Sequence, residues 1–227
     1  MENFEKQIAQ AGLKIKAIKL NSDKPFLWTS GYQMPIYNDN RMFLFYPEYR
    51  KLIIDGFFQI IQQKHISCDI IAGMATAGIP YGILLANKLN LPFIYIREAP
   101  RKHGLKNQIE GMDAKQDFKG SQVVIIEELV STGSSVINAI QAIRNANGII
   151  NSCLSVFNYG FDKTKNEFDS LNPKCEAMSL LTYDTLLKTA KEIGYLTKQQ
   201  TELLQEWRND PFGWGEKHGF PKTKINK

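Results

Sequence analysis

The chain has 227 residues, of which 43% are hydrophobic and 22% are charged, proportions that are typical of a globular protein. No stretch approaches the roughly 18 consecutive apolar residues of a membrane span, and the N-terminus lacks the apolar block of a signal peptide. We therefore expect a cytoplasmic protein without membrane contact. The formal net charge of +5 favours anionic partners, but charge alone does not separate nucleic acid from a phosphorylated small molecule.

The first part of the chain is predicted to contain two helices separated by an aromatic segment. Residues 1–20 mix acids, lysines and apolar residues at helical spacing, which predicts an amphipathic helix. Residues 25–45 are rich in aromatic and turn residues and indicate strands or a hood-like loop segment. Residues 47–64 return to helical spacing, and their broad apolar face consists of Tyr49, Leu52, Ile53, Phe57, Ile60 and Ile61.

Between residues 65 and 160, short apolar runs alternate with patterns of helical spacing. Alternation of this kind is typical of a doubly wound, mainly parallel sheet flanked by helices, so we predict the α/β fold class. The C-terminal stretch 176–209 is predicted to form one or two packing helices. Within the alternating part we predict strands at 68–73, 91–97, 122–127 and 149–159, and helices at 79–90 and 134–148.

These elements predict a single domain that spans residues 1–227. Residues 65–160 would form its core sheet, and residues 1–45 together with the C-terminal segment would form a small hood and packing elements. Ligands of doubly wound sheets bind at the carboxyl ends of the strands. Loops that follow such strand ends are therefore expected to converge on one side, and the candidates are 73–78, 97–121 and 127–135.

The loop from Ser131 to Ser135 lies between a predicted strand and a predicted helix. Its small residues allow backbone N–H groups to point inward, its hydroxyls add donors, and the start of the helix adds partial positive charge. These features suit a phosphate monoester, although the loop alone is equally compatible with a capped helix. It has neither the Gly-Lys-Ser/Thr of a Walker loop nor the glycines of a dinucleotide-binding loop.

Two adjacent acids, Glu127 and Glu128, precede this loop. Carboxylates repel a phosphate, so we expect them to address another part of the same ligand, namely sugar hydroxyls or a metal ion. A ligand with a vicinal diol a few ångströms from a phosphate satisfies both halves of the site. Ribose 5-phosphate is such a ligand.

A strand, two acids, two apolar residues and the run Ser-Thr-Gly-Ser-Ser together resemble the phosphoribosyl pyrophosphate (PRPP) motif of the type I phosphoribosyltransferases. This sequence departs from the motif at Glu128, where that family usually has Asp. The resemblance implies that the acids bind the ribose hydroxyls and that the loop binds the 5-phosphate. The residues that it implies as PRPP contacts are Glu127, Glu128, Leu129, Val130, Ser131, Thr132, Gly133, Ser134 and Ser135.

Further stretches are similar to segments of the orotate phosphoribosyltransferases, and they occur in the expected order. Residues 26–41, FLWTSGYQMPIYNDNR, resemble the N-terminal signature. Residues 71–82, IAGMATAGIPYG, resemble the pyrophosphate-side loop, and residues 94–111, IYIREAPRKHGLKNQIEG, resemble the mobile catalytic loop. With EWRNDPFGW near the C-terminus, the likeness covers most of the chain.

The resemblance implies a Mg²⁺-dependent pentosyltransferase of pyrimidine biosynthesis. Its substrates would be PRPP and orotate, and its products orotidine 5′-monophosphate and pyrophosphate. Mg²⁺ would be held mainly by PRPP and water, with no metal ligands from the protein. The loop 97–120 would reach the active site of the neighbouring subunit, which implies a homodimer.

The resemblance also assigns roles outside the acid strand. Arg97, Arg101 and His103 would contact the pyrophosphate of PRPP. Orotate would lie near Ser131 and two hood residues, Tyr37 and Asn38. The catalytic residues implied are Arg101, His103, Glu127 and Glu128.

Two other functions stay open, because Gln33, Ala77, Glu98 and Glu128 stand where related enzymes often have other residues. One is a phosphoribosyltransferase for a different base, which the HGLKNQIEG stretch disfavours. The other is a PRPP-binding regulator that contacts nucleic acid through basic surface without turnover. The sequence carries no appended DNA-binding unit, so we expect no nucleic-acid partner.

Overall fold

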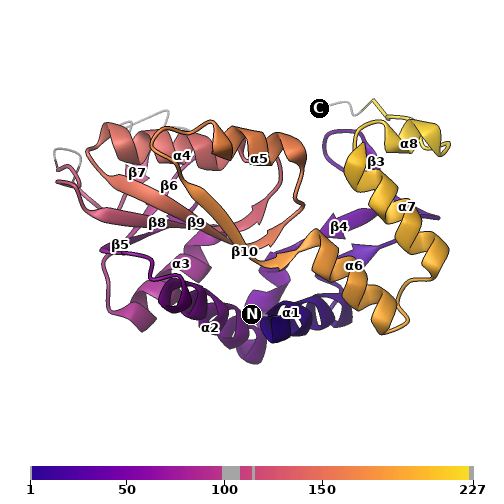
Figure 1. Ribbon diagram of the computed structural model, residues 1–227, viewed down its shortest axis with the longest axis horizontal. Coiled ribbons are helices and arrows are strands. Elements are labelled where there is room, and N and C mark those ends of the chain that lie inside the picture. Colours follow the sequence, from indigo (N-terminus) through magenta and orange to yellow (C-terminus); the bar gives the residue numbers. More distant parts are fainter. Residues whose placement is uncertain (1, 99–107, 114–115, 225–227) are drawn as a thin grey trace.

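The computed structural model describes residues 2–98, 108–113 and 116–224. At its centre lies a six-stranded sheet with the strand order β10-β9-β8-β5-β6-β7 (Figure 1). All neighbouring strands are parallel except β6 and β7, so the predicted α/β class with a mainly parallel sheet is confirmed. The strands are β5 (Ile70–Met74), β6 (Phe93–Ile96), β7 (Ile109–Glu110), β8 (Gln122–Val130), β9 (Ile149–Asn158) and β10 (Glu176–Thr182).

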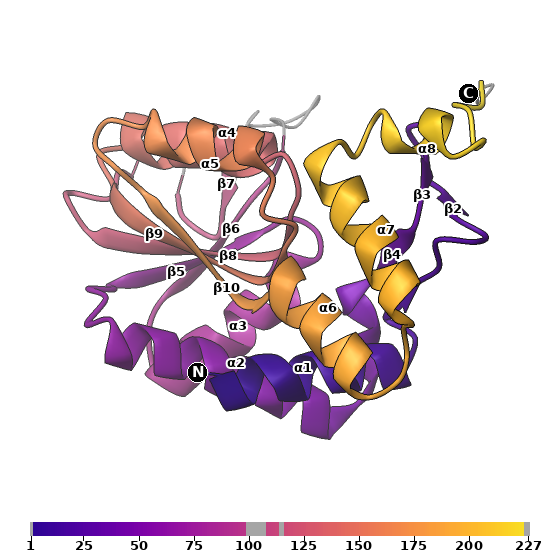
Figure 2. The same ribbon diagram turned by 45° about the vertical axis from the view of Figure 1, so that its right-hand side comes forward.

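Helices cover both faces of the sheet (Figures 1 and 2). Because side chains alternate along a strand, β8 feeds two cores: Val124 and Ile126 pack into one, and Val123 and Ile125 into the other. None of the described helices is long and apolar enough to span a bilayer. The first core faces α1 (Glu2–Lys14), α2 (Pro47–Gln63) and α3 (Gly78–Leu89), and the second faces α4 (Ser134–Asn145) and α5 (Asp162–Asp169).

Residues 18–45 and 183–220 form the hood, which stands beside the sheet (Figure 2). Its N-terminal part consists of two short antiparallel pairs, β1 with β4 and β2 with β3, followed by a 3-10 helix, η1. Buried hood residues such as Met34, Ile36 and Phe43 belong to the same core as the α1–α3 face of the sheet. The hood elements are β1 (Ile18–Leu20), β2 (Phe26–Leu27), β3 (Gln33–Met34), β4 (Ile36–Asn38), η1 (Asn40–Phe45), α6 (Tyr183–Glu192), α7 (Lys198–Asn209) and α8 (Trp214–Lys217).

An aromatic cluster joins the two parts of the hood to the sheet. The ring centroid of Tyr159, at the end of β9, lies 5.9 Å from Trp28 and 5.6 Å from Trp207. Tyr183 lies 5.4 Å from Trp207, whose side chain is fully buried. The indole Nε1 of Trp207 lies 3.0 Å from Sδ of Met34. Trp207 therefore contacts β3, the start of α6 and the end of β9 at once.

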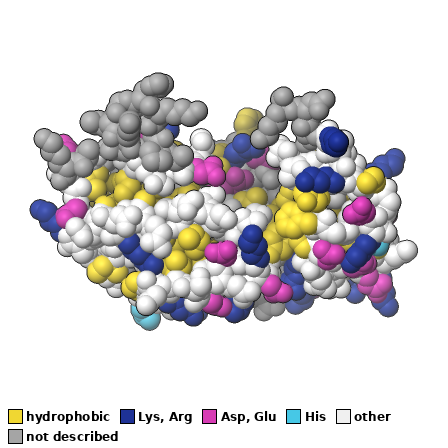
Figure 3. Space-filling model, turned by 90° about the horizontal axis from the view of Figure 1, so that it is seen from above, with side chains coloured by type: hydrophobic (Ala, Val, Ile, Leu, Met, Phe, Trp, Pro, Cys, Tyr) yellow, Lys and Arg dark blue, Asp and Glu magenta, His cyan; other side chains and the backbone are white. Residues whose placement is uncertain are grey.

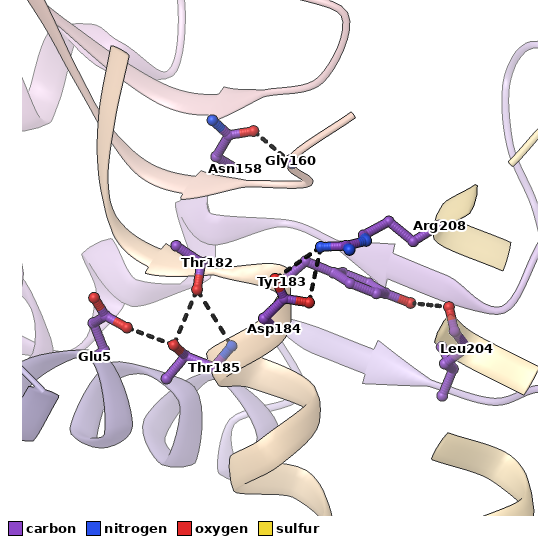
Figure 4. A network of polar contacts seen from close by, with 9 residues as sticks. All are labelled: Glu5, Asn158, Gly160, Thr182, Tyr183, Asp184, Thr185, Leu204 and Arg208. Atoms are coloured by element: carbon purple, nitrogen blue, oxygen red, sulfur yellow. Dashed lines mark hydrogen bonds and ion pairs between the residues drawn. The ribbon is translucent and has the colours of Figure 1, made fainter. Parts of the chain in front are cut away.

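Polar contacts tie the C-terminal helices to the rest of the molecule (Figure 4). Thr182 ends β10 and caps α6, because its hydroxyl accepts the Thr185 N–H at 3.2 Å. The Thr185 hydroxyl in turn donates to the Glu5 carboxylate of α1 at 2.5 Å. On the other side, Arg208 of α7 lies 2.8 Å from both carboxylate oxygens of Asp184. These contacts fix the direction in which the chain leaves the sheet for the hood.

The helix predicted over residues 1–20 is too long. α1 ends at Lys14, and Lys16 adopts a left-handed conformation with φ of 60°. Ile18 and Leu20 are buried and the residue between them is only half-buried, which is the period-two pattern of a strand. Three residues are too few for that pattern to stand out beside a long helical one.

Two predictions for the sheet also need correction. Residues 176–182 form the strand β10 and not a helix, because parallel pairing with β9 outweighs the helix preference of EAMSLLT. The strand predicted at 122–127 continues to Val130, since its last residues still pair with β9. Glu127 and Glu128 therefore lie within a strand and not in the loop that follows it.

Replacement of Trp207 by alanine should destabilise the protein strongly. The change leaves a large cavity where hood and sheet meet, and losses of about 3–5 kcal/mol in the free energy of unfolding are typical of buried Trp→Ala changes. Urea unfolding followed by circular dichroism measures the effect. Tyr195, whose side chain is 41% exposed, provides the control, and Tyr195→Ala should change the free energy by no more than about 0.5 kcal/mol.

Candidate active site

The candidate site lies at the carboxyl ends of the central parallel strands. β5, β8 and β9 are adjacent and parallel, so their carboxyl ends meet at one edge of the sheet. Two of the three predicted loops, 73–78 and 127–135, lie at the ends of β5 and β8, although the second begins only at Ser131 because β8 continues to Val130. The third loop is described only in part, because residues 99–107 and 114–115 lie outside the described residues.

The loop after β8 has the geometry of an anion site. Gly133 has φ of 81° and is the N-cap residue of α4. Within residues 116–224, no side chain caps this helix by a hydrogen bond, so its first-turn N–H groups can donate to a ligand. Thr164 of α5 donates its hydroxyl to the carbonyl of Ser131 and so supports the loop from outside.

Crowding around Gly133 adds a second reason for a glycine at this position. A Cβ there would lie 3.2 Å from atoms of both Thr164 and Phe168, which belong to α5. The loop is therefore held between β8 and α5. Of the other predicted loop residues, Thr132 and Ser135 are half-buried, Ser134 is exposed, and the hydroxyls of Thr132 and Ser134 are 3.4 Å apart.

The loop after β5 brings α3 close to β8. A Cβ on Gly78, the first residue of α3, would lie 2.4 Å from the carbonyl oxygen of Ile126, so only glycine fits at this approach. A cis peptide joins Ala75 and Thr76 just before it. The glycine at position 78 therefore allows the start of α3 to lie against β8 at Ile126.

Glu127 points to the α4 side of the sheet. It shares that side with Cys153 of β9, whose pKa it raises, and with the buried core that contains Ile125. Its carboxylate accepts the Glu128 N–H at 2.6 Å. Burial, and to a smaller extent the neighbouring Glu128 carboxylate, raise the pKa of Glu127 to about 7, while hydrogen bonds from the backbone oppose this rise.

Glu128 points to the opposite side, toward the hood. Its Oε1 accepts the backbone N–H of Asn40 at 2.8 Å, and its own carbonyl accepts from Nδ2 of Asn40 at 3.2 Å. The hydroxyl of Tyr81, on α3, donates to the Asn40 carbonyl at 2.6 Å. Burial raises the pKa of Glu128, while the bond from Asn40 opposes that rise. The two adjacent acids therefore face different surroundings.

The two hood residues predicted for orotate lie on β4, directly before the segment that Glu128 contacts. Asn38 has both side-chain amide atoms buried, and neither has a hydrogen-bond partner among the described residues. Tyr37 is 38% exposed, and the Lys19 ammonium lies 5.6 Å from its ring centroid. A buried amide that lacks both a donor and an acceptor partner is a candidate contact for a planar base.

The remaining predicted residues differ in how much the structure says of them. Arg97 directly follows β6. Its Nε lies 2.9 Å from Glu110 Oε1, and its guanidinium lies 3.4 Å from the Tyr95 hydroxyl. Leu129 and Val130 pair with β9, and the Val130 side chain is buried, so both offer mainly backbone groups. Arg101 and His103 lie outside the described residues.

Sequence reasoning did not identify Asn40, Tyr81 or Thr164 as parts of the site. Asn40 belongs to the turn-rich run YNDNR, whose composition indicates a turn but not a partner. Tyr81 and Thr164 lie on helices and make their contacts through the tertiary fold, so no local pattern marks them.

Known proteins resemble this chain over nearly its whole length. The Phosphoribosyl transferase domain family matches residues 46–175. An orotate phosphoribosyltransferase of Cytophaga hutchinsonii is 40% identical over 212 residues, which are 93% of this chain and 99% of that protein. One of Streptococcus agalactiae is 43% identical over 212 residues with the same coverage.

The fold agrees with these relatives. The crystal structure of orotate phosphoribosyltransferase from Aeropyrum pernix superposes with a TM-score of 0.67 at 22% identity, covering 84% of this chain and 99% of that one. The family match, the long alignments at 40% identity and the PRPP-type loop after β8 agree with one another. The chain therefore belongs to the orotate phosphoribosyltransferase family.

Proposed function

We propose that the protein transfers the 5-phosphoribosyl group of PRPP to orotate, giving orotidine 5′-monophosphate and pyrophosphate in pyrimidine biosynthesis. The observation that carries this proposal is the uncapped loop-and-helix start after β8, which lies beside a hood whose Asn38 amide is buried and unpaired among the described residues. The first element suits a phosphate and the second a base. Relatives that match 93% of the chain support the same reaction.

The loop 131–135 would bind the 5-phosphate through backbone N–H groups and hydroxyls, with α4 adding the positive end of its dipole. Glu127 lies near the end of β8, three residues before Val130, the last residue of the strand. Its carboxylate is the acid proposed for the ribose hydroxyls. In the reaction the bond from C1 of ribose to pyrophosphate breaks, and a bond to the base nitrogen forms. Positive charge grows on the sugar, and a nearby carboxylate stabilises it.

The leaving pyrophosphate needs positive charge. Arg97 directly follows β6 and can supply part of this charge. The family resemblance of the chain assigns Arg101 and His103 to the same task, with His103 as the proton donor. Mg²⁺ would arrive as the Mg²⁺ complex of PRPP and supply further positive charge to the leaving oxygens. Among the described residues, no group of three or more His, Cys, Asp or Glu is placed to hold a metal ion.

Orotate would bind between the hood and the phosphate loop, near Tyr37, Asn38 and Ser131. The Asn38 amide offers one donor and one acceptor side, which match the carbonyl and N–H groups of a pyrimidine edge. A site built to hydrogen-bond such groups rejects bases that lack them, because its own buried groups then stay unpaired.

We further propose that residues 1–227 act as a single cytoplasmic domain and that the protein is a homodimer in which the loop 97–120 reaches the neighbouring active site. One core contains residues of both hood and sheet, which supports a single folding unit. The subunit arrangement is proposed from the family resemblance.

The surface bears on the alternative of a nucleic-acid-binding regulator. On the face shown in Figure 3, basic side chains stand in separate groups with acidic side chains among them. Nucleic acid is usually bound by a continuous basic patch or stripe. The described residues on this face form no such continuous stripe.

The direct test follows the absorbance of orotate in the presence of PRPP and Mg²⁺, with uracil, adenine and hypoxanthine in parallel. We expect metal-dependent turnover with orotate alone. Turnover with another base and not with orotate would show that the other base is the substrate. Saturable PRPP binding by a folded protein that turns over no base would favour the regulator.

Replacement of Asn38 by alanine should weaken orotate binding selectively. Loss of one or two hydrogen bonds corresponds to roughly a tenfold rise in the KM for orotate, while the KM for PRPP should stay within about twofold. Steady-state kinetics with each substrate varied in turn measures both. Asn151→Ala, at an exposed position near the opposite end of β9, is the matched control and should change neither constant. An equal rise in both KM values for Asn38→Ala would contradict the assignment of Asn38 to the base site.

Replacement of Glu127 by glutamine should stabilise the protein at alkaline pH and weaken PRPP binding. In the wild type the folded-state pKa of Glu127 is about 7, above the ordinary glutamate value of 4.5, so the folded protein holds this proton more tightly than the unfolded chain. Its contribution to the free energy of unfolding therefore falls as pH rises from about 4.5 to 7. Glutamine does not titrate, so the variant does not lose this part of its free energy of unfolding as the pH rises.

Urea unfolding at pH 5 and pH 8 measures the difference between Glu127→Gln and the wild type. The difference should shift in favour of the variant at pH 8, on the order of 1–3 kcal/mol. The KM for PRPP at pH 8 should rise about tenfold, because the amide is a weaker partner for the diol and the cationic sugar. A stability difference that does not change with pH would contradict the assigned environment of Glu127.

A further inference from the structure

We propose that Arg208, near the end of α7, binds the carboxylate of orotate and so makes the enzyme select orotate over bases that lack this group. The inference deepens the proposed function and rests on it, because it names a protein contact for the proposed substrate. It gives a binding role to the C-terminal helices, which the sequence predicts only as packing elements.

A pocket of about 300 Å³ lies between the loop 131–135, the turn after β9 and the end of α7. Thr132, Gly160 and Phe161 line it on the side of the sheet, and Arg208 and Phe212 line it on the side of the hood. Thr132 directly follows Ser131, the loop residue proposed to lie near orotate. The pocket therefore adjoins the place where the ribose and the base would meet.

The chemistry of orotate places its carboxylate on this side of the base. The carboxyl group is attached to C6, next to N1, and N1 is the atom that forms the bond to ribose. The carboxylate therefore lies close to the sugar, while the N3–H and the C4 carbonyl lie at the far edge of the ring. The Asn38 amide would pair with that far edge, and a group in the pocket beside Thr132 would meet the carboxylate.

Arg208 is held in place with part of its guanidinium left for a ligand (Figure 4). Its Nη1 lies 2.8 Å from both carboxylate oxygens of Asp184, at the start of α6. A Cβ on Gly160 would lie 3.9 Å from the same nitrogen, so the guanidinium stands beside the turn after β9. Nε and Nη2 make no hydrogen bond to another described residue. Their two N–H groups form a fork that matches the two oxygens of a carboxylate.

The acids near this pocket are weaker partners for Arg208 than a bound carboxylate would be. Asp162 lines the pocket together with Lys163, and both side chains are exposed, so their opposite charges largely offset each other. Asp184 is 70% exposed and is therefore screened by water. A carboxylate bonded to Nε and Nη2 would touch the guanidinium on its other edge from Asp184. Attraction by Arg208 at contact distance then outweighs the repulsion by Asp184.

Two other cations near the proposed base contacts are engaged elsewhere. Arg41 pairs with Asp39 through its Nε at 2.6 Å, and the Lys19 ammonium lies 5.6 Å from the ring centroid of Tyr37. The hydrogen bonds of Arg41, and to a smaller extent the charge of Lys19, hold the pKa of Asp39 below its ordinary value. Both cations thus act on an acid of the hood, whereas Arg208 lines the pocket.

The test titrates the protein with two nucleotides that differ only in the carboxylate, orotidine 5′-monophosphate and uridine 5′-monophosphate. Calorimetry should show that the wild type binds the first on the order of 10- to 100-fold more tightly, which is typical of a charged hydrogen-bonded pair. Arg208→Gln should reduce this ratio to about threefold or less and leave the Kd for uridine 5′-monophosphate within about twofold. Arg208→Lys keeps the charge but not the fork, so its ratio should be intermediate. An unchanged ratio in Arg208→Gln would overturn the proposal.

Asp184→Ala separates ligand binding from the positioning of α7 against α6. The change breaks the ion pair but leaves the guanidinium, so the preference for orotidine 5′-monophosphate should stay within about threefold of the wild type. If Arg208 served only to hold the two helices together, Asp184→Ala would lose the preference as Arg208→Gln does, and that result would contradict the proposed contact. Lys19→Gln should reduce the preference less than Arg208→Gln, and the reverse order would assign the carboxylate to Lys19.

Turnover distinguishes failure of this inference from failure of the proposed function. Arg208→Gln should raise the KM for orotate on the order of 10- to 100-fold and leave the KM for PRPP within about twofold. If the wild type turns over no orotate, the proposed function fails, but the titrations still decide the role of Arg208 because they need no reaction. Equal binding of the two nucleotides by the wild type would overturn the inference even if orotate is turned over.

Discussion

The parallel pairing of β8 with β5 on one edge and β9 on the other is the constraint on which the site depends. β5 pairs with β8 as far as Ile126 and β9 pairs with it as far as Val130, and the pairing with β9 decides where the loop 131–135 begins. Gly78 then allows α3 to approach the same strand end, and α5 supports the loop through Thr164. The site is built outward from one strand.

The same constraint explains how two acids can precede an anion-binding loop. Their carboxylates have different surroundings, since Glu127 lies near Cys153 and Glu128 contacts Asn40. Burial raises the pKa of Glu127 to about 7, which lowers the average negative charge beside the loop near neutral pH. The Glu128 carboxylate accepts a hydrogen bond from the Asn40 N–H. The repulsion between the two acids is therefore reduced by protonation of one and by the hydrogen bond to the other.

The sequence predicts the sheet and the loops well, because strands such as 68–73 and 149–159 carry continuous apolar runs and are followed by helical spacing. It fails where tertiary pairing decides, as at residues 176–182, whose composition suits a helix. It places Ser131–Ser135 correctly at a strand end, since a loop between a strand and a helix is a local pattern. It does not indicate the direction of Glu128 or the contact with Asn40, which is 88 residues distant in the chain. Such partners follow only from the assembled fold.

The hood is attached by two kinds of interaction, and they act differently. The aromatic cluster around Trp207 stabilises the hood by burial, which is large and has little directional preference. The bonds around Asn40 contribute less free energy but depend steeply on distance and angle. Burial therefore keeps the hood in place, and the polar contacts decide where residues 38–40, proposed to lie beside the base, stand relative to β8. A protein that must bring a base to within bonding distance of a sugar needs both, because a displacement of about 1 Å is sufficient to slow a reaction greatly.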